Sequence, residues 1–296
     1  MQHGGSVTDA FIAIDWGTTN RRVYLIEGGR VVRSRRDDMG VLAMAGSGYE
    51  TALADIRVEC GDLPVLMAGM VGSTIGWKDA GYISLPAAIP DLACGLCWID
   101  DRTAIVPGLA IDDGVRTDVM RGEEVQLLGA IAAGLVPADA WLCQPGTHCK
   151  WARLEKGQVV RFVTAMSGEL FALLRQHGVL SRQLSAQVTD GPAFAKGVTE
   201  GATRDLSASL FSVRSLGVLG KLPDEEASSY ASGILIGSDV AARLDEIGTQ
   251  PVYILADAEL GGLYVRAATL LGGTAILIDS HAAFVAGITA IRGLSL

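Results

Sequence analysis

Two short stretches of this chain combine glycine, hydroxyl and charged side chains in a pattern suited to binding phosphate. One runs from Asp15 to Arg21 (DWGTTNR) and the other from Gln144 to Lys150 (QPGTHCK). Glycine allows the backbone to approach a ligand closely, and consecutive N–H groups beside threonine hydroxyls form a concave anion site. The candidate phosphate ligands are therefore Gly17, Thr18, Thr19, Asn20, Gly146, Thr147 and His148.

The charged residues of these stretches suggest further roles. Asp15 cannot bind phosphate, and its carboxylate is suited to a hard cation such as Mg²⁺. Lys150 is a candidate cation near a nucleotide, whereas His148 could either donate to phosphate or have a structural role. A single Gly-Thr turn is often ordinary hairpin chemistry. Two matching turns that face each other would instead grip a polyphosphate from both sides.

The strands on either side of these turns are repeated as well. The block Glu27–Arg33 (EGGRVVR) returns as Glu155–Arg161 (EKGQVVR) after 128 residues, and the two Gly-Thr turns lie 129 residues apart. Each copy predicts an apolar strand, a turn, an alternating strand, a tight glycine turn and a third strand. A repeat of nearly half the chain length predicts two α/β domains of related topology flanking a cleft. We place them at residues 1–136 and 137–296, because Pro137 ends the preceding helix.

A cluster of charged side chains precedes the second copy. Asp118, Arg121, Glu123 and Glu124 come just before a segment with helical spacing. Acidic residues favour the first turn of a helix, so the cluster could be a solvated helix start. Alternatively, one of its carboxylates could accept the proton of an attacking hydroxyl.

A second candidate site is the loop after the short apolar strand at residues 64–69. In open α/β sheets, ligands bind beyond the carboxyl ends of the strands. Gly72, Ser73, Trp77 and Lys78 are therefore candidates for contacting a substrate. The alternative is a surface loop that Trp77 anchors to the core.

Composition excludes several classes of protein. With 296 residues, of which 49% are hydrophobic and 19% charged, the chain can bury a large core without disulfides or a structural metal. The net charge of −9 argues against a nucleic-acid partner, which requires a basic face. The five cysteines include a lone C-x-x-C pair and are typical of reduced thiols in the cytoplasm. We expect a cytoplasmic protein with no membrane partner, since no signal peptide or membrane-length apolar run is present.

Several nucleotide and hydrolase motifs are missing. The chain has no G-x-x-x-x-G-K-[ST] loop and no opening G-x-G-x-x-G, which disfavours a P-loop protein and a Rossmann dehydrogenase. It also lacks G-x-S-x-G, which disfavours an α/β-hydrolase.

Taken together, the motifs resemble those of the sugar kinase/Hsp70/actin ATPase superfamily, and within it the 2-dehydro-3-deoxygalactonokinase family. Asp15–Thr19 looks like the first phosphate motif and Pro145–His148 the second. The further similar segments are Gly69–Ser73, Asp118–Glu124, Pro145–Trp151, Met166–Phe171 and Ser232–Gly237. The resemblance implies two RNase H-like (actin-like ATPase) domains, the first with sugar-binding loops and the second with nucleotide-binding elements, and it implies ATP and Mg²⁺ as cofactors.

The resemblance also suggests a catalytic base and an adenosine site. Glycerol kinase-type enzymes have a Gly-Asp pair that leads into a helix just before their second phosphate motif. Glu123, preceded by glycine, is similarly placed and is the implied base, with Glu124 and Asp118 as alternatives. Superfamily members hold adenosine where a strand ends beside a helix start, which implies Asp257 and Gly261.

The substrate implied by the resemblance is the small sugar acid 2-dehydro-3-deoxy-D-galactonate, phosphorylated at its terminal hydroxyl in galactonate catabolism. Its carboxylate requires a cation, and Lys78 and Arg121 are the two candidates. Thr74 and Ile75 depart from the family's usual long polar pair, so no contact is assigned to them.

Two other functions remain open on the sequence. The chain could be a kinase of the same fold for another sugar or sugar acid, because the discrimination of epimers depends on a few hydrogen bonds. It could also be a non-catalytic ATP-binding sensor, although no added interaction module is visible. A homodimer is compatible with the sequence, which does not specify the oligomeric state.

Overall fold

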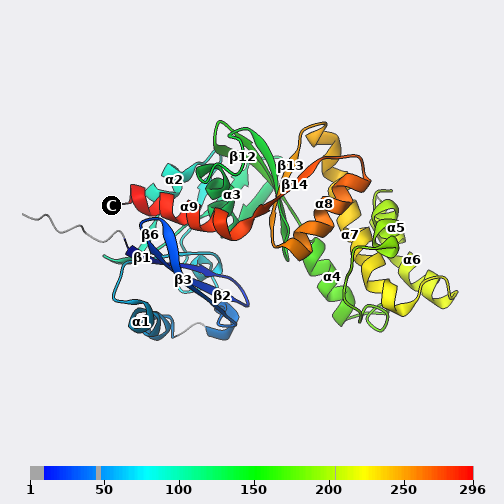
Figure 1. Cartoon of the computed structure of the whole chain (residues 1–296), viewed down its shortest axis with the longest axis horizontal. Coiled ribbons are helices and arrows are strands. Elements are labelled where there is room, and N and C mark those ends of the chain that lie inside the picture. Colours follow the sequence, from blue (N-terminus) through cyan, green and yellow to red (C-terminus); the bar gives the residue numbers. More distant parts are fainter. Residues whose placement is uncertain (1–9, 45–47, 204, 296) are drawn as a thin grey trace, which may run out of the picture. The chain divides into compact units, whose positions relative to one another are not determined.

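A computed structural model describes residues 10–44, 48–203 and 205–295 of the chain (Figure 1). The chain forms two compact units. The first contains residues up to Ala138 together with Glu155–Arg161 and the segment from Ser280 onward, and the second contains Asp139–Leu154 and Phe162–Asp279. No helix in the described ranges is long and apolar enough to span a bilayer.

The first unit is built on a six-stranded sheet. Strands β1, β2 and β3 form an antiparallel meander, and β4 and β7 extend the sheet parallel to β1. The order across the sheet is β3 (Arg30–Asp37), β2 (Arg21–Glu27), β1 (Ala10–Trp16), β4 (Val65–Ala68), β7 (Thr103–Ile105) and β6 (Cys97–Asp100). A separate small sheet contains β5 (Tyr82–Ser84), β8 (Gly108–Asp112) and β9 (Thr117–Met120).

Helices cover both faces of the six-stranded sheet. On one face, α1 (Tyr49–Cys60) packs its buried side chains against Ile12, Ile14 and Trp16 of β1. On the other face, α9 (Ser280–Leu294) brings Phe284 against Tyr24 of β2, with ring centroids 5.5 Å apart. The remaining helical segments of this unit are η1 (Val41–Met44), η2 (Met70–Gly72), α2 (Ile89–Cys94) and α3 (Glu123–Ala132).

The sheet of the second unit repeats the same arrangement. Its order is β12 (Gln158–Ala165), β11 (Cys149–Glu155), β10 (Ala140–Gln144), β13 (Val252–Ala256) and β14 (Ala275–Asp279). A hairpin is again followed by strands that run parallel to the first strand of the unit. The two sheets therefore share one topology, as the repeated motif predicts.

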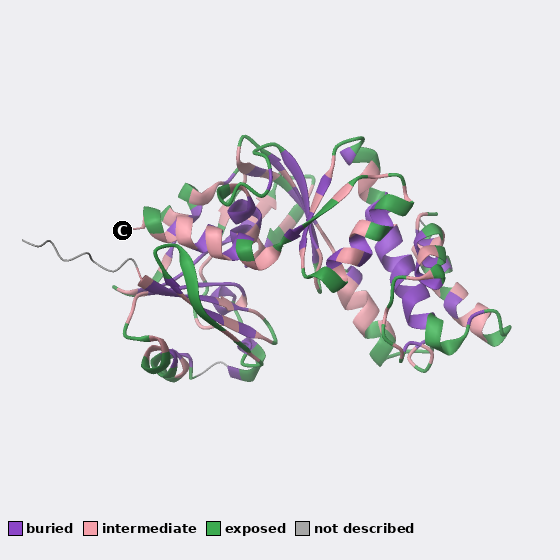
Figure 2. Cartoon of the chain, viewed as in Figure 1, coloured by how far each residue is buried: buried purple, intermediate pink, exposed green. Residues whose placement is uncertain are grey.

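The helices of the second unit are longer and pack closely. They are α4 (Ser167–Gln176), α5 (Pro192–Gly201), α6 (Leu206–Val218), α7 (Asp224–Ile247) and α8 (Ala258–Leu270). Much of α7 is buried (Figure 2). A Cβ added at Gly197 or Gly201 of α5 would overlap a carbonyl oxygen of α7, and one at Gly233 or Gly237 would overlap a carbonyl of α5. These four glycines allow the two backbones to touch.

The observed units differ from the expected domains of residues 1–136 and 137–296. The change of unit after Ala138 lies close to the expected boundary, but α9 returns to the first unit. Close packing of α9 on α3 explains this return, because a Cβ at Gly129 would overlap the Ala283 carbonyl oxygen and one at Gly287 would overlap that of Val125. The tip of the β11–β12 hairpin also belongs to the first unit, since Val159 pairs with Ala87 there.

Candidate active site

Asp15 lies near the carboxyl end of β1, in the middle of the six-stranded sheet. Its Cα is paired with Arg22 of β2 on one side and Ala68 of β4 on the other. Burial raises the pKa of the Asp15 carboxyl to about 6, although Arg22 and Arg36 act in the opposite direction. A carboxylate held in such a place is stabilised by a bound cation.

Two glycines with positive φ bring the start of α3 to Asp15. Gly69, which follows β4, has a φ of +95°, and a Cβ there would lie 2.8 Å from the Trp16 carbonyl oxygen. Gly122, which caps α3, has a φ of +105°, and its Cβ would lie 3.1 Å from the Gly69 Cα. Both conformations favour glycine. The ends of β1 and β4 and the start of α3 therefore meet at one place, where Glu123 further raises the pKa of Asp15.

The three candidate bases have different environments. Glu124 is fully buried, and its two carboxyl oxygens accept the Gly122 N–H at 2.8 and 2.7 Å. Burial, and then the charge of Glu123, raise the pKa of Glu124 to about 8. Asp118 lies on β9, where its Oδ1 accepts the Val119 N–H at 2.8 Å. Glu123 is partly exposed, interacts electrostatically with Asp15 and accepts the Arg121 N–H at 3.0 Å.

Lys78 and Arg121 are the two cationic side chains predicted to bind the substrate's carboxylate. Of these, Arg121 lies beside this site. Its guanidinium is largely buried, packs over the Tyr82 ring at 4.3 Å and donates to the Gly81 carbonyl at 3.0 Å. Its Nε and Nη1 atoms are buried and have no hydrogen-bond partner within the described residues. Lys78, by contrast, is exposed and donates to the Trp98 carbonyl at 2.9 Å.

The loop after β4 is anchored by its own side chains. Trp77 stacks on Tyr49 of α1, with ring centroids 5.7 Å apart and planes 4° from parallel. The Ser73 hydroxyl is buried and donates to the Met70 carbonyl at 2.7 Å. Gly72 is buried close to Arg121, since a Cβ there would lie 3.0 Å from Arg121 Nη1. The structure thus shows Trp77 as an anchor and gives Gly72 a packing role beside Arg121.

The first Gly-Thr turn is held through its carbonyl oxygens. The carbonyls of Gly17, Thr18 and Thr19 accept the N–H groups of Val41, Leu42 and Gly40. The turn is closed by a hydrogen bond of 2.9 Å from the Gly17 N–H to the Asn20 carbonyl. Thr18 and Thr19 are exposed, so their side chains remain accessible to a ligand.

The second Gly-Thr turn is backed by the start of α4. The Glu169 N–H donates to the Thr147 carbonyl at 2.9 Å, and a Cβ at Gly168 would overlap the Gly146 carbonyl oxygen. His148 Nε2 lies 2.7 Å from a Glu169 carboxylate oxygen, which gives the histidine a structural partner. Lys150 is buried and donates to the Thr164 hydroxyl at 2.9 Å.

A cavity of about 260 Å³ opens beside this second turn. It is lined by the turn, the start of α4, the middle of α7 and the start of α8, through Gly146, Thr147, Ser167, Gly168, Phe171, Ser232, Leu235, Ile236, Leu260 and Tyr264. Beneath it, the buried Asp239 of α7 accepts the Ser167 hydroxyl at 3.1 Å, the Tyr264 hydroxyl at 3.3 Å and the Trp151 indole N–H at 3.0 Å. Burial raises the pKa of Asp239, and the hydrogen bonds from Trp151, Cys149 and Ser167 oppose that shift.

The two residues suggested for adenosine do not line this cavity. Asp257 caps α8, with its Oδ1 accepting the Leu260 N–H at 3.0 Å. Gly261 is packed so closely that a Cβ would overlap Leu277. Leu260 and Tyr264 of the same helix line the cavity instead, and Asp239 fixes the hydroxyl of Tyr264. These three positions are not apparent from the sequence, because helical spacing alone cannot distinguish a cavity wall from the core.

Both sheets contain the same order of five strands, and in each unit a Gly-Thr turn follows the first of the repeated strands. In the first unit Asp15 lies near the end of that strand. This arrangement defines a protein of the actin-like ATPase fold. Component A of the (R)-2-hydroxyglutaryl-CoA dehydratase of Acidaminococcus fermentans has this fold and aligns with a TM-score of 0.53, at 12% identity over 96% of each chain. The sequence model of the 2-keto-3-deoxy-galactonokinase family matches residues 15–291. The chain belongs to this family.

Two relatives are similar over nearly their whole length. The 2-dehydro-3-deoxygalactonokinase of Escherichia coli K12 is 38% identical over 289 residues, which cover 96% of this chain and 98% of that protein. A solved structure from Sinorhizobium meliloti, described as a "putative 2-dehydro-3-deoxygalactonokinase protein", is 36% identical and has a TM-score of 0.88 over 95% of this chain and 97% of its own.

Proposed function

We propose that this chain is an ATP-dependent kinase that phosphorylates the terminal hydroxyl of 2-dehydro-3-deoxy-D-galactonate. Family membership supports the reaction and the substrate. The observation within the structure that carries the proposal is the meeting of Asp15 and Glu123 at the joint end of β1, β4 and α3. Phosphoryl transfer depends mainly on alignment and on stabilisation of charge, and this arrangement provides a cation ligand beside a proton acceptor.

In this proposal the oxygen of the terminal hydroxyl bonds to the γ-phosphorus of ATP, and Glu123 accepts the proton that this hydroxyl loses. The bond from that phosphorus to the β,γ-bridging oxygen breaks, and its electron pair leaves with ADP. Glu123 suits this role because it is partly exposed and interacts with Asp15, whereas Glu124 is fully buried.

Asp15 would be the protein ligand of Mg²⁺. Its oxygen donors match that hard cation, which usually keeps several waters and binds few protein carboxylates. Within the described ranges, no group of three His, Cys, Asp or Glu side chains is arranged to hold a metal. A single carboxylate with phosphate oxygens and water is therefore the coordination that the chain supports. Mg²⁺ bound there would neutralise charge on the phosphates.

Nucleotide binding is assigned to the two Gly-Thr turns and to the cavity of the second unit. That cavity has apolar walls from Phe171, Leu235, Ile236 and Leu260, and the Ser167 hydroxyl on its surface. Such a lining, apolar with a few placed polar groups, is typical of small-molecule sites. We assign the cavity to the nucleoside part of ATP.

Arg121 is the residue we assign to the carboxylate of the sugar acid. It is a buried guanidinium whose Nε and Nη1 have no hydrogen-bond partner among the residues described, and such atoms are costly to leave unpaired. A guanidinium N–H that has no partner can donate a charge-assisted hydrogen bond to a carboxylate. Arg121→Met is expected to raise the KM for the sugar acid at least about tenfold, whereas Lys78→Met should leave it within about twofold.

The test is an ADP-release assay over a panel of 2-keto-3-deoxy and aldonic acids. We expect sugar-dependent turnover that is fastest with 2-dehydro-3-deoxy-D-galactonate and is lost in Glu123→Gln. Faster turnover of another acid would show a kinase with a different substrate. ATP binding without any sugar-dependent turnover would show a sensor and contradict the proposal.

A further inference from the structure

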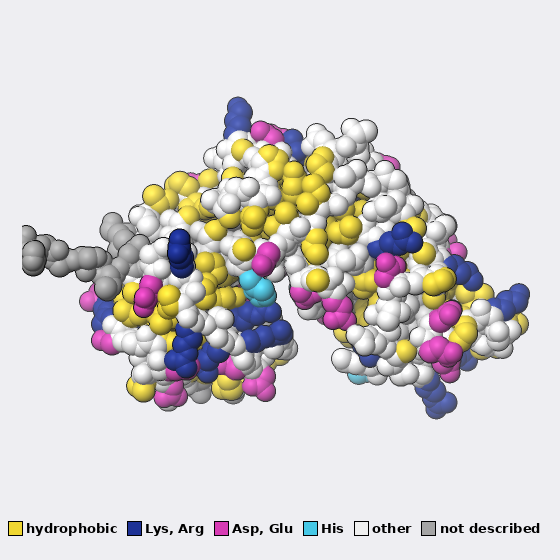
Figure 3. Space-filling view, in the orientation of Figure 1, with side chains coloured by type: hydrophobic (Ala, Val, Ile, Leu, Met, Phe, Trp, Pro, Cys, Tyr) yellow, Lys and Arg dark blue, Asp and Glu magenta, His cyan; other side chains and the backbone are white. Residues whose placement is uncertain are grey.

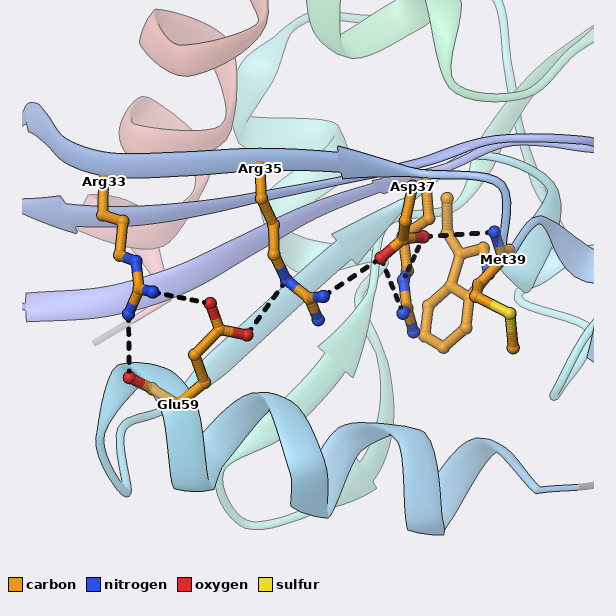
Figure 4. A network of polar contacts seen from close by, with 7 residues as sticks. Arg33, Arg35, Asp37, Met39 and Glu59 are labelled. Carbon is orange, nitrogen blue, oxygen red and sulfur yellow. Dashed lines mark hydrogen bonds and ion pairs between the residues drawn. The ribbon is translucent and has the colours of Figure 1, made fainter.

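Two carboxylate networks of this protein differ in the groups that surround them. In the first unit, Arg33 and Arg35 pair with Glu59 at 2.9 and 3.1 Å, and Figure 4 shows these alternating charges between β3 and α1. Their side chains are partly exposed, like the charged side chains that Figure 3 shows on the surface. Asp239 of α7 is instead buried, and it accepts hydrogen bonds from neutral groups. A carboxylate only accepts hydrogen bonds, so Asp239 fixes the direction of its donors' protons.

The donors of Asp239 come from three other elements of the second unit. Trp151 of β11 donates to Oδ1 at 3.0 Å, and the hydroxyls of Ser167 and Tyr264 donate to Oδ2 at 3.1 and 3.3 Å. The two hydroxyl oxygens lie 3.2 Å apart, so they form a triangle with Oδ2. Burial raises the pKa of Asp239. The hydrogen bonds from Trp151 and Ser167, together with the charge of Arg243, oppose this rise and favour the carboxylate.

Both hydroxyl protons are used inside this triangle. Ser167 and Tyr264 carry one hydroxyl proton each, and the carboxylate of Asp239 has none to give. Either both hydroxyls donate to the carboxylate, or one donates to the other, which then donates to the carboxylate. In each arrangement the hydroxyl oxygens have only lone pairs left. Ser167 and Tyr264 line the cavity beside the second Gly-Thr turn, so they present hydrogen-bond acceptors to a ligand there.

The place of Ser167 limits which part of a nucleotide can meet these acceptors. Ser167 precedes Gly168, where a Cβ would overlap the Gly146 carbonyl oxygen of the second turn. The hydroxyls therefore lie at the end of the cavity next to the turn. Phosphate oxygens are anionic and accept hydrogen bonds, so acceptors backed by a carboxylate disfavour them. The ribose joins the phosphates to the base, and its hydroxyls can donate.

We propose that Asp239 is a positioning residue that makes this cavity select ribose, because through Ser167 and Tyr264 it presents acceptors to a hydroxyl of the nucleotide sugar. This proposal rests on the proposed kinase function, which assigns the cavity to the nucleoside part of ATP. A site built to pair with a hydroxyl rejects the analogue that lacks it, since the buried polar groups of the site are then left unpaired. The protein therefore distinguishes ribonucleotides from deoxyribonucleotides.

Calorimetry on the full-length chain tests the selection directly, with ATP, 2′-deoxyATP and 3′-deoxyATP as ligands. At least one deoxynucleotide should bind at least about tenfold more weakly than ATP. The analogue with fluorine at that position should bind as weakly, because fluorine cannot donate a hydrogen bond. Equal affinities for ATP and both deoxynucleotides would overturn the proposal. A fluoro analogue that binds as tightly as ATP would also overturn it, because no donor would then be required.

Two variants test the role of the triangle in this selection. Ser167→Ala removes one acceptor. Asp239→Asn keeps the size of the side chain, and because Trp151 donates to Oδ1, the amide N–H turns to the hydroxyls. Each variant should reduce the discrimination between ATP and the rejected deoxynucleotide at least about threefold. The matched control is Ser212→Ala, which removes a hydroxyl 2.8 Å from that of Tyr230 in the same unit and should keep the wild-type discrimination.

Circular dichroism would verify the fold of each variant. Weaker binding of ATP and deoxynucleotide by the same factor in Ser167→Ala and Asp239→Asn would show a merely structural role and overturn the proposal. In an active kinase, the two variants should raise the KM for ATP and leave the KM for the sugar acid within about twofold.

Binding can be measured without transfer, so this inference and the kinase function can fail separately. Discrimination that depends on Asp239 in a chain without sugar-dependent turnover would support the inference and reject the proposed function. Sugar-dependent turnover with wild-type discrimination in both variants would reject the inference and leave the function intact.

Discussion

The two Gly-Thr turns share one strand–turn–strand frame but differ in what stands beside them. The first follows Asp15, whereas the corresponding position before the second turn is Gln144, which is largely buried. The first is held by the N–H groups of residues 40–42, and the second by the start of α4. The strand before the first turn carries the carboxylate of Asp15, and the second turn adjoins the cavity lined by α7 and α8. The comparison suggests a division of work between the two copies of the repeat. The phosphoryl group is transferred at the first copy, and the nucleoside binds at the second.

The residues after the turns show the same divergence in a milder form. Arg21 follows the first turn and forms two hydrogen bonds with Asp37, at 3.1 and 2.9 Å. Lys150 holds the corresponding place after the second turn and donates to Thr164. Both cations are largely buried and have partners on the neighbouring strand. An equivalent position in a repeat therefore keeps its structural role while its chemistry changes.

The largest expected effect comes from replacing Asp15 of the first copy with glutamine, the residue at the corresponding position of the second copy. Asp15→Gln should lower kcat about 10³-fold, because it removes the carboxylate assigned to the cation. Its free energy of unfolding should not fall at pH 7, since the native site disfavours the charged form. The control is Gln144→Asn in the second copy, for which we expect a kcat within about fivefold of the wild type. Equal losses in the two variants would contradict the division of work.

The next effect is a pH dependence of stability that comes from Glu124 of the first unit. The pKa of Glu124 is about 8 in the folded chain, against its ordinary value of 4.5. The folded state therefore binds the proton more tightly, and this contribution to stability is complete below pH 4.5 and is lost as pH rises towards 8. Relative to Glu124→Gln, the wild type should lose up to about 1.4 kcal/mol per pH unit across this window. Urea denaturation at several pH values measures it, and parallel curves for the two proteins would refute it.

A smaller effect is expected where α4 supports the second turn. Gly168→Ala places a Cβ against the Gly146 carbonyl oxygen, and such overpacking costs about 1–3 kcal/mol. The KM for ATP should rise at least about tenfold while the KM for the sugar acid stays the same, because the turn must move. The control is Gly262→Ala in α8, where a Cβ meets nothing within 4 Å. An unchanged KM for ATP in Gly168→Ala would show that the support from α4 does not affect nucleotide binding.

The smallest effect concerns His148, which takes the place of Thr19 in the second copy. His148 contacts Glu169, and the two side chains are 49% and 37% exposed, respectively. Exposed pairs contribute about 0.2–1 kcal/mol, so His148→Ala should change stability by less than about 1 kcal/mol. If the role of His148 is structural, the KM for ATP stays within about fivefold, and a larger rise would assign the imidazole to phosphate.

The repeated motif was sufficient to predict the three-strand meander in each sheet, because the turn residues and the alternation of β2 and β11 are local signals. The resemblance singled out both Asp15 and Glu123, and their interaction at the end of β1 emerges from the structure. The return of α9 to the first unit was not, since it depends on Gly129 and Gly287 meeting across more than 150 residues. The sequence also does not show that Arg22 is paired with Asp15 and Arg36 with Arg22, because these pairings exist only in the register of three strands.

The most direct test of the division of work is to follow the phosphorus of ATP. Wild type and Glu123→Gln would be incubated with MgATP and 2-dehydro-3-deoxy-D-galactonate, and phosphorus NMR would detect the ester while calorimetry measures ATP affinity. The account predicts a phosphate ester at the terminal carbon with the wild type, at least about 10²-fold slower formation with Glu123→Gln, and an ATP affinity that is equal in the two proteins. Ester formation at the wild-type rate by Glu123→Gln would contradict it.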